Sequence, residues 1–309
     1  MNTIMFAEDV SALQPCAATV GFFDGVHCGH RYLLRHVSEI AHEKGLESTV
    51  ITFDRHPREV LRSDFQPHLL STLEEKVFLL SKTGMDNCIV LPFSRQMAGL
   101  PARDFIGEIL SGKLNVRTLV TGYDNRFGHN RSEGFEDYVR YGHEFNMDVR
   151  QWSPYAMEGV SISSSVVRSF LMEGEVEMAG RCLGYPYTLA GKVVHGEHVG
   201  TGLGFPTANM VVAEPRKLIP SPGVYAVKVR LGNGEYNNGM MNIGMRPTFG
   251  GSRMSLEVHL FHFGRDIYGE AVSVSFVCRI RSERKFRSPA ELVNQLNKDR
   301  ETAEACLGE

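Results

Sequence analysis

The sequence predicts two domains: an α/β domain with a parallel sheet, then a small all-β domain that forms an antiparallel barrel and ends in a helix. The chain has 309 residues, enough for about two domains of ~100–200 residues each. Its first half alternates unbroken apolar segments with helix-like segments, the pattern of a parallel sheet covered on both faces. After residue 187 short strand-like segments follow one another between Gly- and Asn-containing turns, which is typical of a small barrel.

In the first half, strands and helices alternate along the chain. We expect strands at 17–23, 48–54, 87–93, 116–124 and 147–152, and helices at 31–45, 71–84, 101–112 and 132–145. The helix at 71–84 opens with two capping-box spacings, Ser71 to Glu74 and Thr72 to Glu75. Ligands of such sheets bind at the carboxyl ends of the strands.

The second half reads as strands at 188–196, 223–231, 235–244, 255–263 and 272–281. A final helix is expected from Ser288, with Pro289 at its first position and Glu291 completing a capping box. We place the domain boundary near residue 185, which gives domains 1–184 and 185–309.

Composition excludes several classes of protein. The net charge is −3 and no long Lys/Arg block occurs, so a nucleic-acid partner is not expected. No apolar run approaches the ~18 residues of a membrane span, and the N-terminus lacks the features of a signal peptide. The cysteines form no C-x-x-C pair and are expected to be reduced thiols of a cytoplasmic protein, neither disulfides nor a zinc site: Cys16, Cys28, Cys88, Cys182, Cys278 and Cys306.

His27 and His30 lie in a glycine-rich turn where the first predicted strand passes into a helix. A helix N-terminus attracts phosphate through its unpaired N–H groups and partial positive charge, and two imidazole rings would add donors for a phosphoryl group in the transition state. Taken alone, an H-x-x-H pair is more often structural, capping and packing at the turn. A zinc pair is a further alternative, without an evident third ligand.

Three segments of this half resemble one family. GFFDGVHCGH at 21–30 is similar to the H-x-G-H signature of the nucleotidyltransferase superfamily, and its F-D-G-V-H portion most resembles bacterial bifunctional riboflavin kinase/FAD synthetases. TGYDNRFGHNRSEG at 121–134 resembles the G-Y-D-F-R-F-G loop of that family, and SISSSVVRSFL at 161–171 resembles its I-S-S-T-x-I-R motif. The resemblance implies a Rossmann-like nucleotidyltransferase domain.

The same resemblance implies roles for individual residues. His27 and His30 would bind the ATP phosphates and stabilise the adenylyl-transfer transition state, with Arg168 contacting the phosphates from the opposite side through its fixed fork of donors. Further positions are implied in ATP or phosphate binding: Gly21, Phe23, Asp24, Gly25, Gly29, Asp124, Ser164 and Ser165. The chain departs from the family at Asn125, where an aromatic residue is common, at Ser165 for Thr, and at Val166 for a basic residue.

The second glycine-rich stretch, GEHVGTGLGFPTANM at 196–210, matches neither G-x-x-x-x-G-K-[ST] nor G-x-G-x-x-G. On composition alone it would be a flexible hairpin loop. Its P-T-A-N segment, however, resembles the signature of riboflavin kinases, as do 242–249, 255–269 and 283–288. That resemblance implies a riboflavin kinase-like barrel with Mg²⁺ held by Thr207 and Asn209, and a flap over the ATP phosphates made by Gly200, Gly202 and Gly204. Thr201 stands for a frequent Arg, and His262 for Asp.

Glu257 is the candidate base of the second domain. Leu256, Val258 and Leu260 alternate toward the expected core, which puts Glu257 and His259 on the opposite face. For an isolated strand those two residues would most simply be solvated. The family resemblance favours Glu257 as the carboxylate that accepts a proton from the 5′-hydroxyl of riboflavin, with His259 shaping the site.

We therefore expect a cytoplasmic enzyme of flavin-cofactor synthesis whose substrates are ATP, riboflavin and FMN and whose metal is Mg²⁺. The second domain would convert riboflavin to FMN, and the first would convert FMN to FAD with release of pyrophosphate. Two alternatives stay open: another nucleotidyl transfer in the first domain, such as cytidylyl transfer, and a flavin-binding sensor with inactive sites. The sequence does not indicate the oligomeric state.

Overall fold

The computed structural model describes residues 1–6, 13–61, 66–123, 125–129, 133–195, 202, 204–248 and 251–308. The chain divides into two compact units, which we call the first unit (Met1–Ser164) and the second unit (Ser165–Glu309). The functional boundary predicted near residue 185 is a separate matter and stays a prediction.

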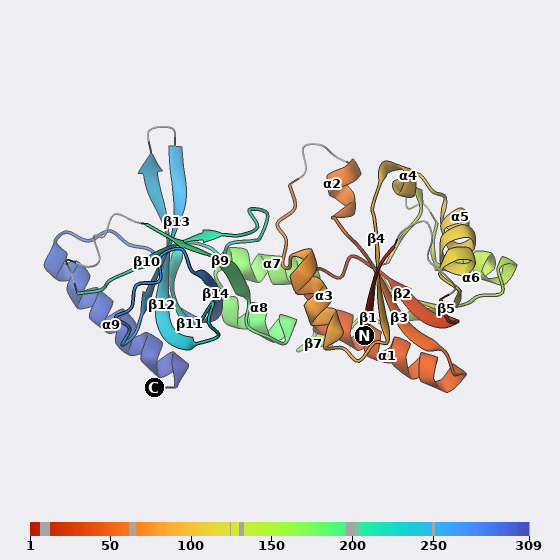
Figure 1. Ribbon diagram of the computed structural model, residues 1–309, viewed down its shortest axis with the longest axis horizontal. Coiled ribbons are helices and arrows are strands. Elements are labelled where there is room, and N and C mark those ends of the chain that lie inside the picture. Colours follow the sequence, from red (N-terminus) through yellow and green to blue (C-terminus); the bar gives the residue numbers. More distant parts are fainter. Residues whose placement is uncertain are drawn as a thin grey trace. The chain divides into compact units, whose positions relative to one another are not determined.

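The first unit contains a six-stranded parallel sheet in the order β1-β4-β3-β2-β5-β6 (Figure 1). This confirms the predicted α/β class. The strands are β1 (Asn2–Met5), β2 (Cys16–Val20), β3 (Glu47–Phe53), β4 (Asn87–Leu91), β5 (Val116–Gly122) and β6 (Asp148–Trp152). Strand β1 was not predicted, because it is a short, largely exposed edge strand whose four residues carry no unbroken apolar run.

Helices pack on both faces of this sheet. One face is covered by α1 (Cys28–Lys44) and α3 (Leu73–Ser81), which contribute Leu34, Val37 and Leu80 to its core. The other is covered by a helical stretch comprising α5 (Ala102–Asp104) and η2 (Phe105–Lys113), together with α6 (Phe135–Glu144). The smaller elements are η1 (Asp24–Val26), α2 (Pro57–Leu61), α4 (Arg95–Ala98) and the two-stranded pair of β7 (Ala156–Met157) and β8 (Val160–Ser161).

The ends of α1 and α3 follow local rules that the sequence displays. Gly45 ends α1 with φ 64°, a left-handed conformation that glycine adopts at little cost. Thr72 caps α3: its hydroxyl accepts from Glu75 N, and the Glu75 carboxylate accepts from Thr72 N. The other predicted spacing is not the cap, because the Ser71 hydroxyl donates to Asp24 instead.

The second unit is a closed barrel in the order β10-β13-β12-β11-β14-β9, with antiparallel neighbours (Figure 1). Its strands are β9 (Thr188–Val194), β10 (Ala208–Val212), β11 (Gly223–Leu231), β12 (Tyr236–Thr248), β13 (Gly251–Leu260) and β14 (Ala271–Arg281). The predicted barrel is thus confirmed. Strand β10 was not predicted, since on composition the stretch at 196–210 is a flexible hairpin loop. Two helices, α7 (Ser164–Glu173) and α8 (Val176–Leu183), precede the barrel.

Helix α9 (Pro289–Leu307) packs on the outside of the barrel, where Val293, Leu296 and Ala303 meet residues of β11, β12 and β14. It begins as predicted: Ser288 Oγ accepts from Glu291 N, although the Glu291 carboxylate accepts from Arg287 N and so does not complete the capping box. Asp299, with a side chain only 1% exposed, forms a 2.7 Å ion pair with Arg281 of β14.

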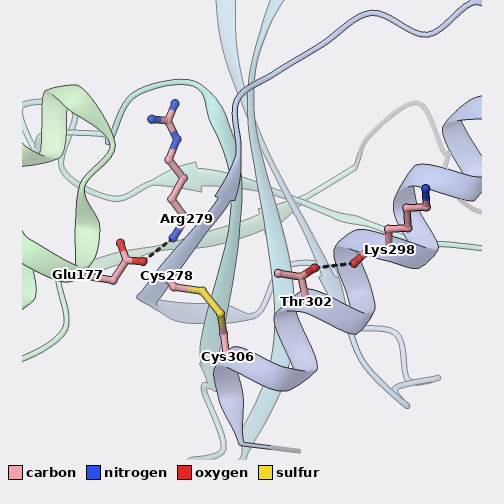
Figure 2. Close-up of a disulfide and its surroundings, with 6 residues drawn as sticks. All are labelled: Glu177, Cys278, Arg279, Lys298, Thr302 and Cys306. Carbon is pink, nitrogen blue, oxygen red and sulfur yellow. Dashed lines mark hydrogen bonds between the residues drawn. A yellow bond between two sulfur atoms is a disulfide. The ribbon is translucent and has the colours of Figure 1, made fainter.

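Cys278 and Cys306 correct the expectation of reduced thiols throughout. A disulfide joins Cys278 on β14 to Cys306 in the last turn of α9, so helix and barrel are also linked covalently (Figure 2). No spacing in the sequence indicates this bond, because the packing of α9 brings together two residues 28 positions apart. By contrast, Cys16 and Cys88 are buried thiols of the first unit, and burial raises the pKa of each to about 11.

No helix in the described part of the chain is both long enough and apolar enough to cross a membrane.

Candidate active sites

A strained loop follows β2 in the first unit and delivers the predicted histidines. Phe23 has φ 54° and Val26 has φ 37°, left-handed conformations that are uncommon for such residues and concentrate at functional sites. The Asp24 carboxylate is buried and accepts from Leu70 N at 3.0 Å and Ser71 N at 2.9 Å. These bonds hold the loop against the segment that precedes α3. They show Asp24 engaged with the protein, while its predicted contact with ATP stays a prediction.

His27 caps the N-terminus of α1. Its Nδ1 accepts from His30 N at 3.2 Å, which assigns the proton of the neutral ring to Nε2. His27 is 4% exposed, and its ring stacks on that of His30 with the centroids 3.6 Å apart. His27 therefore has the capping and packing role that the sequence left open as an alternative. Its Nε2–H donor is also compatible with binding a phosphate.

His30 is held in its neutral form. Removal of its ring from water, followed by the positive charge that His27 and Lys76 bring near it, holds its pKa well below the ordinary value of 6.5. Its Nδ1 is buried and makes no hydrogen bond to the residues that the structure describes. Phe23 packs edge-on against the ring at 5.0 Å between centroids. The two imidazole rings thus add nitrogen atoms that can form hydrogen bonds at a helix N-terminus, which itself attracts anions.

The glycines of this motif have different reasons to be glycine. At Gly29 a Cβ would lie 3.1 Å from Nδ1 of His27 and 3.0 Å from the carbonyl oxygen of Ile162, so a side chain would press on the cap. Gly25 has φ 74° and donates its N–H to Ser71 Oγ at 2.9 Å. At Gly21 a Cβ would lie 3.0 Å from the ring of Phe23.

The remaining predicted residues of this site are only partly described. Ser164 Oγ donates to Asp24 O at 3.1 Å, which brings that hydroxyl to the strained loop. Ser165 and Arg168 belong to the second unit, and their phosphate contacts stay predictions. Asp124 lies outside the described residues. Its neighbour Asn125, a departure from the family pattern, donates to the Val20 carbonyl at the end of β2.

In the second unit, the ladder of β10, β13 and β12 aligns three polar residues. Glu257 pairs with Asn209 of β10 on one side and with Asn242 of β12 on the other. Residues directly opposite each other on neighbouring strands project to the same face. A carboxylate flanked by two amides therefore occupies one face of the barrel. Asn242 lies in a segment that matched the family, but the sequence analysis gave it no role.

A pocket of about 290 Å³ lies on this face and includes Glu257 and Asn242. Leu292 and Leu296 of α9 close one side, and Phe205 and Met240 add further apolar surface. Its charged groups are Glu257, Arg281, Glu283 and Arg284. An apolar pocket with a few converging polar groups is the usual form of a small-molecule site. Glu257 thus lies in a pocket and not on an open solvated face.

A second pocket, of about 370 Å³, opens at the end of the barrel between β10, β13 and the loop at 263–268. Arg265, Asp266 and Tyr268 are among its lining residues. Thr207 lines both pockets. The predicted metal ligand therefore lies where two separate ligand-sized spaces meet.

His259 fixes the segment that carries Thr207. It is 9% exposed, and its Nδ1 donates to the Pro206 carbonyl at 2.8 Å. Burial, opposed by that bond, lowers its pKa from the ordinary 6.5. The expectation that His259 shapes the site agrees with this contact but stays a prediction as to function.

Other expectations met different outcomes. Gly200 and Thr201 lie outside the described residues, whereas Gly202 and Gly204 are exposed and Gly204 has φ 81°. Met240 and Met241 are buried, whereas Met245 is 42% exposed. In the described residues, no group of three or more His, Cys, Asp or Glu side chains is arranged to hold a metal ion.

Comparison with known proteins identifies both units. The FAD synthetase family model matches residues 9–166, and the riboflavin kinase family model matches residues 183–307. A bifunctional riboflavin kinase/FMN adenylyltransferase from Haemophilus influenzae is 41% identical over 293 residues, 95% of this chain and 94% of the relative. The chain belongs to the bifunctional riboflavin kinase/FMN adenylyltransferase family. The Bacillus subtilis member is 38% identical over 92% of this chain and 90% of its own length.

One solved structure covers both units of this family member. It is described as a macrolide-efflux protein from Streptococcus pneumoniae, is 33% identical, and superimposes with a TM-score of 0.89 over 98% of this chain and 99% of its own. The description as an efflux protein concerns that protein. The likeness supports the order of elements in both units.

Proposed function

We propose that this chain phosphorylates riboflavin to FMN in its second unit and adenylylates FMN to FAD in its first. The first step consumes one ATP and releases ADP, and the second consumes another ATP and releases pyrophosphate. The observation that carries the proposal is the position of Thr207 between two pockets, with Glu257 in the wall of one of them. Phosphoryl transfer needs a donor and an acceptor that meet at one point.

In the kinase half, the pocket under α9 would take riboflavin and the pocket at the barrel end would take ATP. Glu257 would accept the proton of the 5′-hydroxyl as the oxygen attacks the terminal phosphorus of ATP. Asn242, beside Glu257, is suited to hold the carboxylate or the ribityl chain by hydrogen bonding. His259 would keep the Pro206 carbonyl, and with it the Thr207 peptide, in a fixed orientation.

Thr207 and Asn209 fit the Mg²⁺ that both steps of this chemistry call for. They offer a hydroxyl and an amide oxygen, and Glu257 lies across the ladder from Asn209, so the donors are hard oxygens of the kind Mg²⁺ prefers. When bound, the ion would neutralise charge on the triphosphate. Thr207 and Asn209 would hold it beside the point where the pockets meet.

In the adenylyltransfer half, no general base is needed. The phosphate of FMN has a second pKa near ~6 and is largely dianionic at neutral pH. His27, through its Nε2–H, and His30 would donate to the ATP phosphates at the N-terminus of α1, aided by Ser164, Ser165 and Arg168. The glycines at 21, 25 and 29 let the backbone approach. We assign this half to residues 1–184 and the kinase half to 185–309, and we place the enzyme in the cytoplasm.

Chromatography of the products formed from riboflavin, ATP and Mg²⁺ tests the proposal. FMN should appear first and FAD should follow. His30→Ala should slow FAD formation while sparing FMN formation, and equal loss of both would contradict the assignment of two sites. FMN without FAD would leave another nucleotidyl transfer for the first unit, which competition between ATP and CTP would reveal. Bound flavin without any product would indicate a sensor.

A further inference from the structure

Lys76 of α3 is a buried lysine that neither the sequence analysis nor the proposed mechanism uses. Lys76 is 2% exposed. Nζ donates to the carbonyl oxygen of Phe53 at 2.8 Å and to that of Phe22 at 3.1 Å. It also lies 4.0 Å from the centroid of the Phe22 ring. Among the residues that the structure describes, its hydrogen bonds go to carbonyl groups and not to a carboxylate.

The two carbonyls mark the edge of the sheet where the histidines lie. Phe53 is the last residue of β3, and Phe22 follows β2 immediately before the strained loop at 23–26. The segment before α3 holds the same loop through the Asp24 carboxylate. Lys76 therefore holds the residue before the loop, while the segment before α3 holds Asp24 within it. The loop in turn leads to His27 at the start of α1.

The charge of Lys76 matters as well as its bonds. The titratable groups that act on it are Asp24 on η1, Cys88 on β4 and Asp54 after β3, and it acts in turn on His30 of α1. Burial outweighs the attraction of these groups and lowers its pKa from 10.5 to about 8. At pH 7 it is still mainly an ammonium. The charge of a cation that is removed from water and not hydrogen-bonded to a carboxylate is weakly screened. It therefore raises the electrostatic potential at neighbouring groups.

We propose that Lys76 is a positioning residue for nucleotidyl transfer: its buried ammonium fixes the ends of β2 and β3 and adds positive potential where the nucleotide triphosphate binds. The inference rests on the adenylyl transfer proposed above. It differs from a purely structural role because it requires the charge and not only the two hydrogen bonds, which a neutral amine could also donate.

Lys76→Met removes the charge and the hydrogen-bond donors but keeps a side chain of similar length. Lys76→Arg keeps a positive charge that does not titrate in this pH range. Lys44→Met is the matched control. Lys44 bonds Thr118 and Asp148 at the opposite, amino-terminal end of the strands. We expect Lys76→Met to lower kcat/KM for FAD formation by about 10- to 50-fold at pH 7, with riboflavin phosphorylation within about twofold. Lys44→Met should change neither activity.

The pH profile separates the two roles. Wild-type FAD formation should decline above pH about 8, as Lys76 loses its proton, and Lys76→Arg should abolish that decline. Removing a like charge should also raise the pKa of His30 in Lys76→Met, which NMR titration reads without relying on activity. If the wild-type enzyme formed no FAD, the proposed adenylyl transfer would be wrong. The NMR titration of His30 would still show whether the charge of Lys76 acts on this site.

Two results would overturn the inference. The first is a Lys76→Met enzyme with normal FAD formation and an unchanged His30 titration. The second is parallel loss of both activities together with a lowered melting temperature, which would make Lys76 a core residue only. If Lys76→Arg proves too bulky to fold, the absence of the alkaline decline in Lys76→Met serves in its place.

Discussion

Asn209 and Glu257 lie directly opposite each other on the antiparallel strands β10 and β13. The position of the P-T-A-N segment relative to the candidate base is thereby determined by the register of one pair of strands. A slip of one residue would turn one of the two side chains to the other face of the barrel. The separation between Asn209, a proposed metal ligand, and Glu257, the candidate base, is thus set by the sheet and not by a loop. Phosphoryl transfer would require that separation to be constant.

Glu257→Gln should abolish most riboflavin phosphorylation. The amide keeps the shape of the carboxylate but accepts no proton, and general-base catalysis is worth about 10²–10⁴-fold in rate. We expect kcat for FMN formation to fall within that range while FAD formation from added FMN is unchanged. Unaltered kinase turnover in a rapid-quench assay would exclude Glu257 as the base.

Asn209→Ala should raise the Mg²⁺ concentration needed for half-maximal kinase activity by about tenfold, a loss of about 1.4 kcal/mol. The reason is the loss of the amide oxygen that lies directly opposite Glu257 on the ladder. Asn237→Ala is the matched control, because Asn237 lies on the same barrel with its amide bonded to Glu235. Equal Mg²⁺ dependence in the two variants would remove Asn209 from the metal site.

Much of the fold could be predicted because local signals agree with the tertiary structure. Unbroken apolar runs marked β2 to β5, and the Thr72–Glu75 box and Gly45 marked helix ends that the structure confirms. Strands β1 and β10 escaped prediction for physical reasons. The first is a short edge strand that pairs with β4 and adds only Ile4 to the core. The second contains Asn and follows Pro, so its strand character comes from its neighbours.

Candidate site residues could be named from the sequence where they lie in a short motif, as at His27, His30 and Glu257; their roles stay predictions. The site was not predictable where distant segments meet. Lys76 looks like an ordinary polar position of an amphipathic helix, and only the packing of α3 on the sheet buries it. Likewise, nothing in the sequence places α9 over the pocket that contains Glu257.

The first unit should lose stability as the pH falls below 6.5. The folded pKa of His30 lies below that ordinary value, so the unfolded chain binds the proton more readily, and the free energy of unfolding decreases as protons are added. In urea denaturation between pH 5 and 7.5, His30→Gln should show a shallower decline than wild type. His42→Gln, at an exposed position of the same helix, is the control. Parallel curves for wild type and His30→Gln would contradict the shift.

Cys306→Ser should destabilise the second unit by about 3 to 4 kcal/mol, the chain-entropy value for a closed loop of this size, here a separation of 28 residues. Because α9 covers the pocket that contains Glu257, loosening it should also raise KM for riboflavin more than KM for ATP. Urea unfolding with and without a dithiol reductant is the decisive comparison. The reductant should lower the free energy of unfolding of the wild type to that of the variant, and it should leave the value for the variant unchanged. A wild-type curve that does not respond to reductant would mean that the Cys278–Cys306 bond contributes nothing to holding α9 on the barrel.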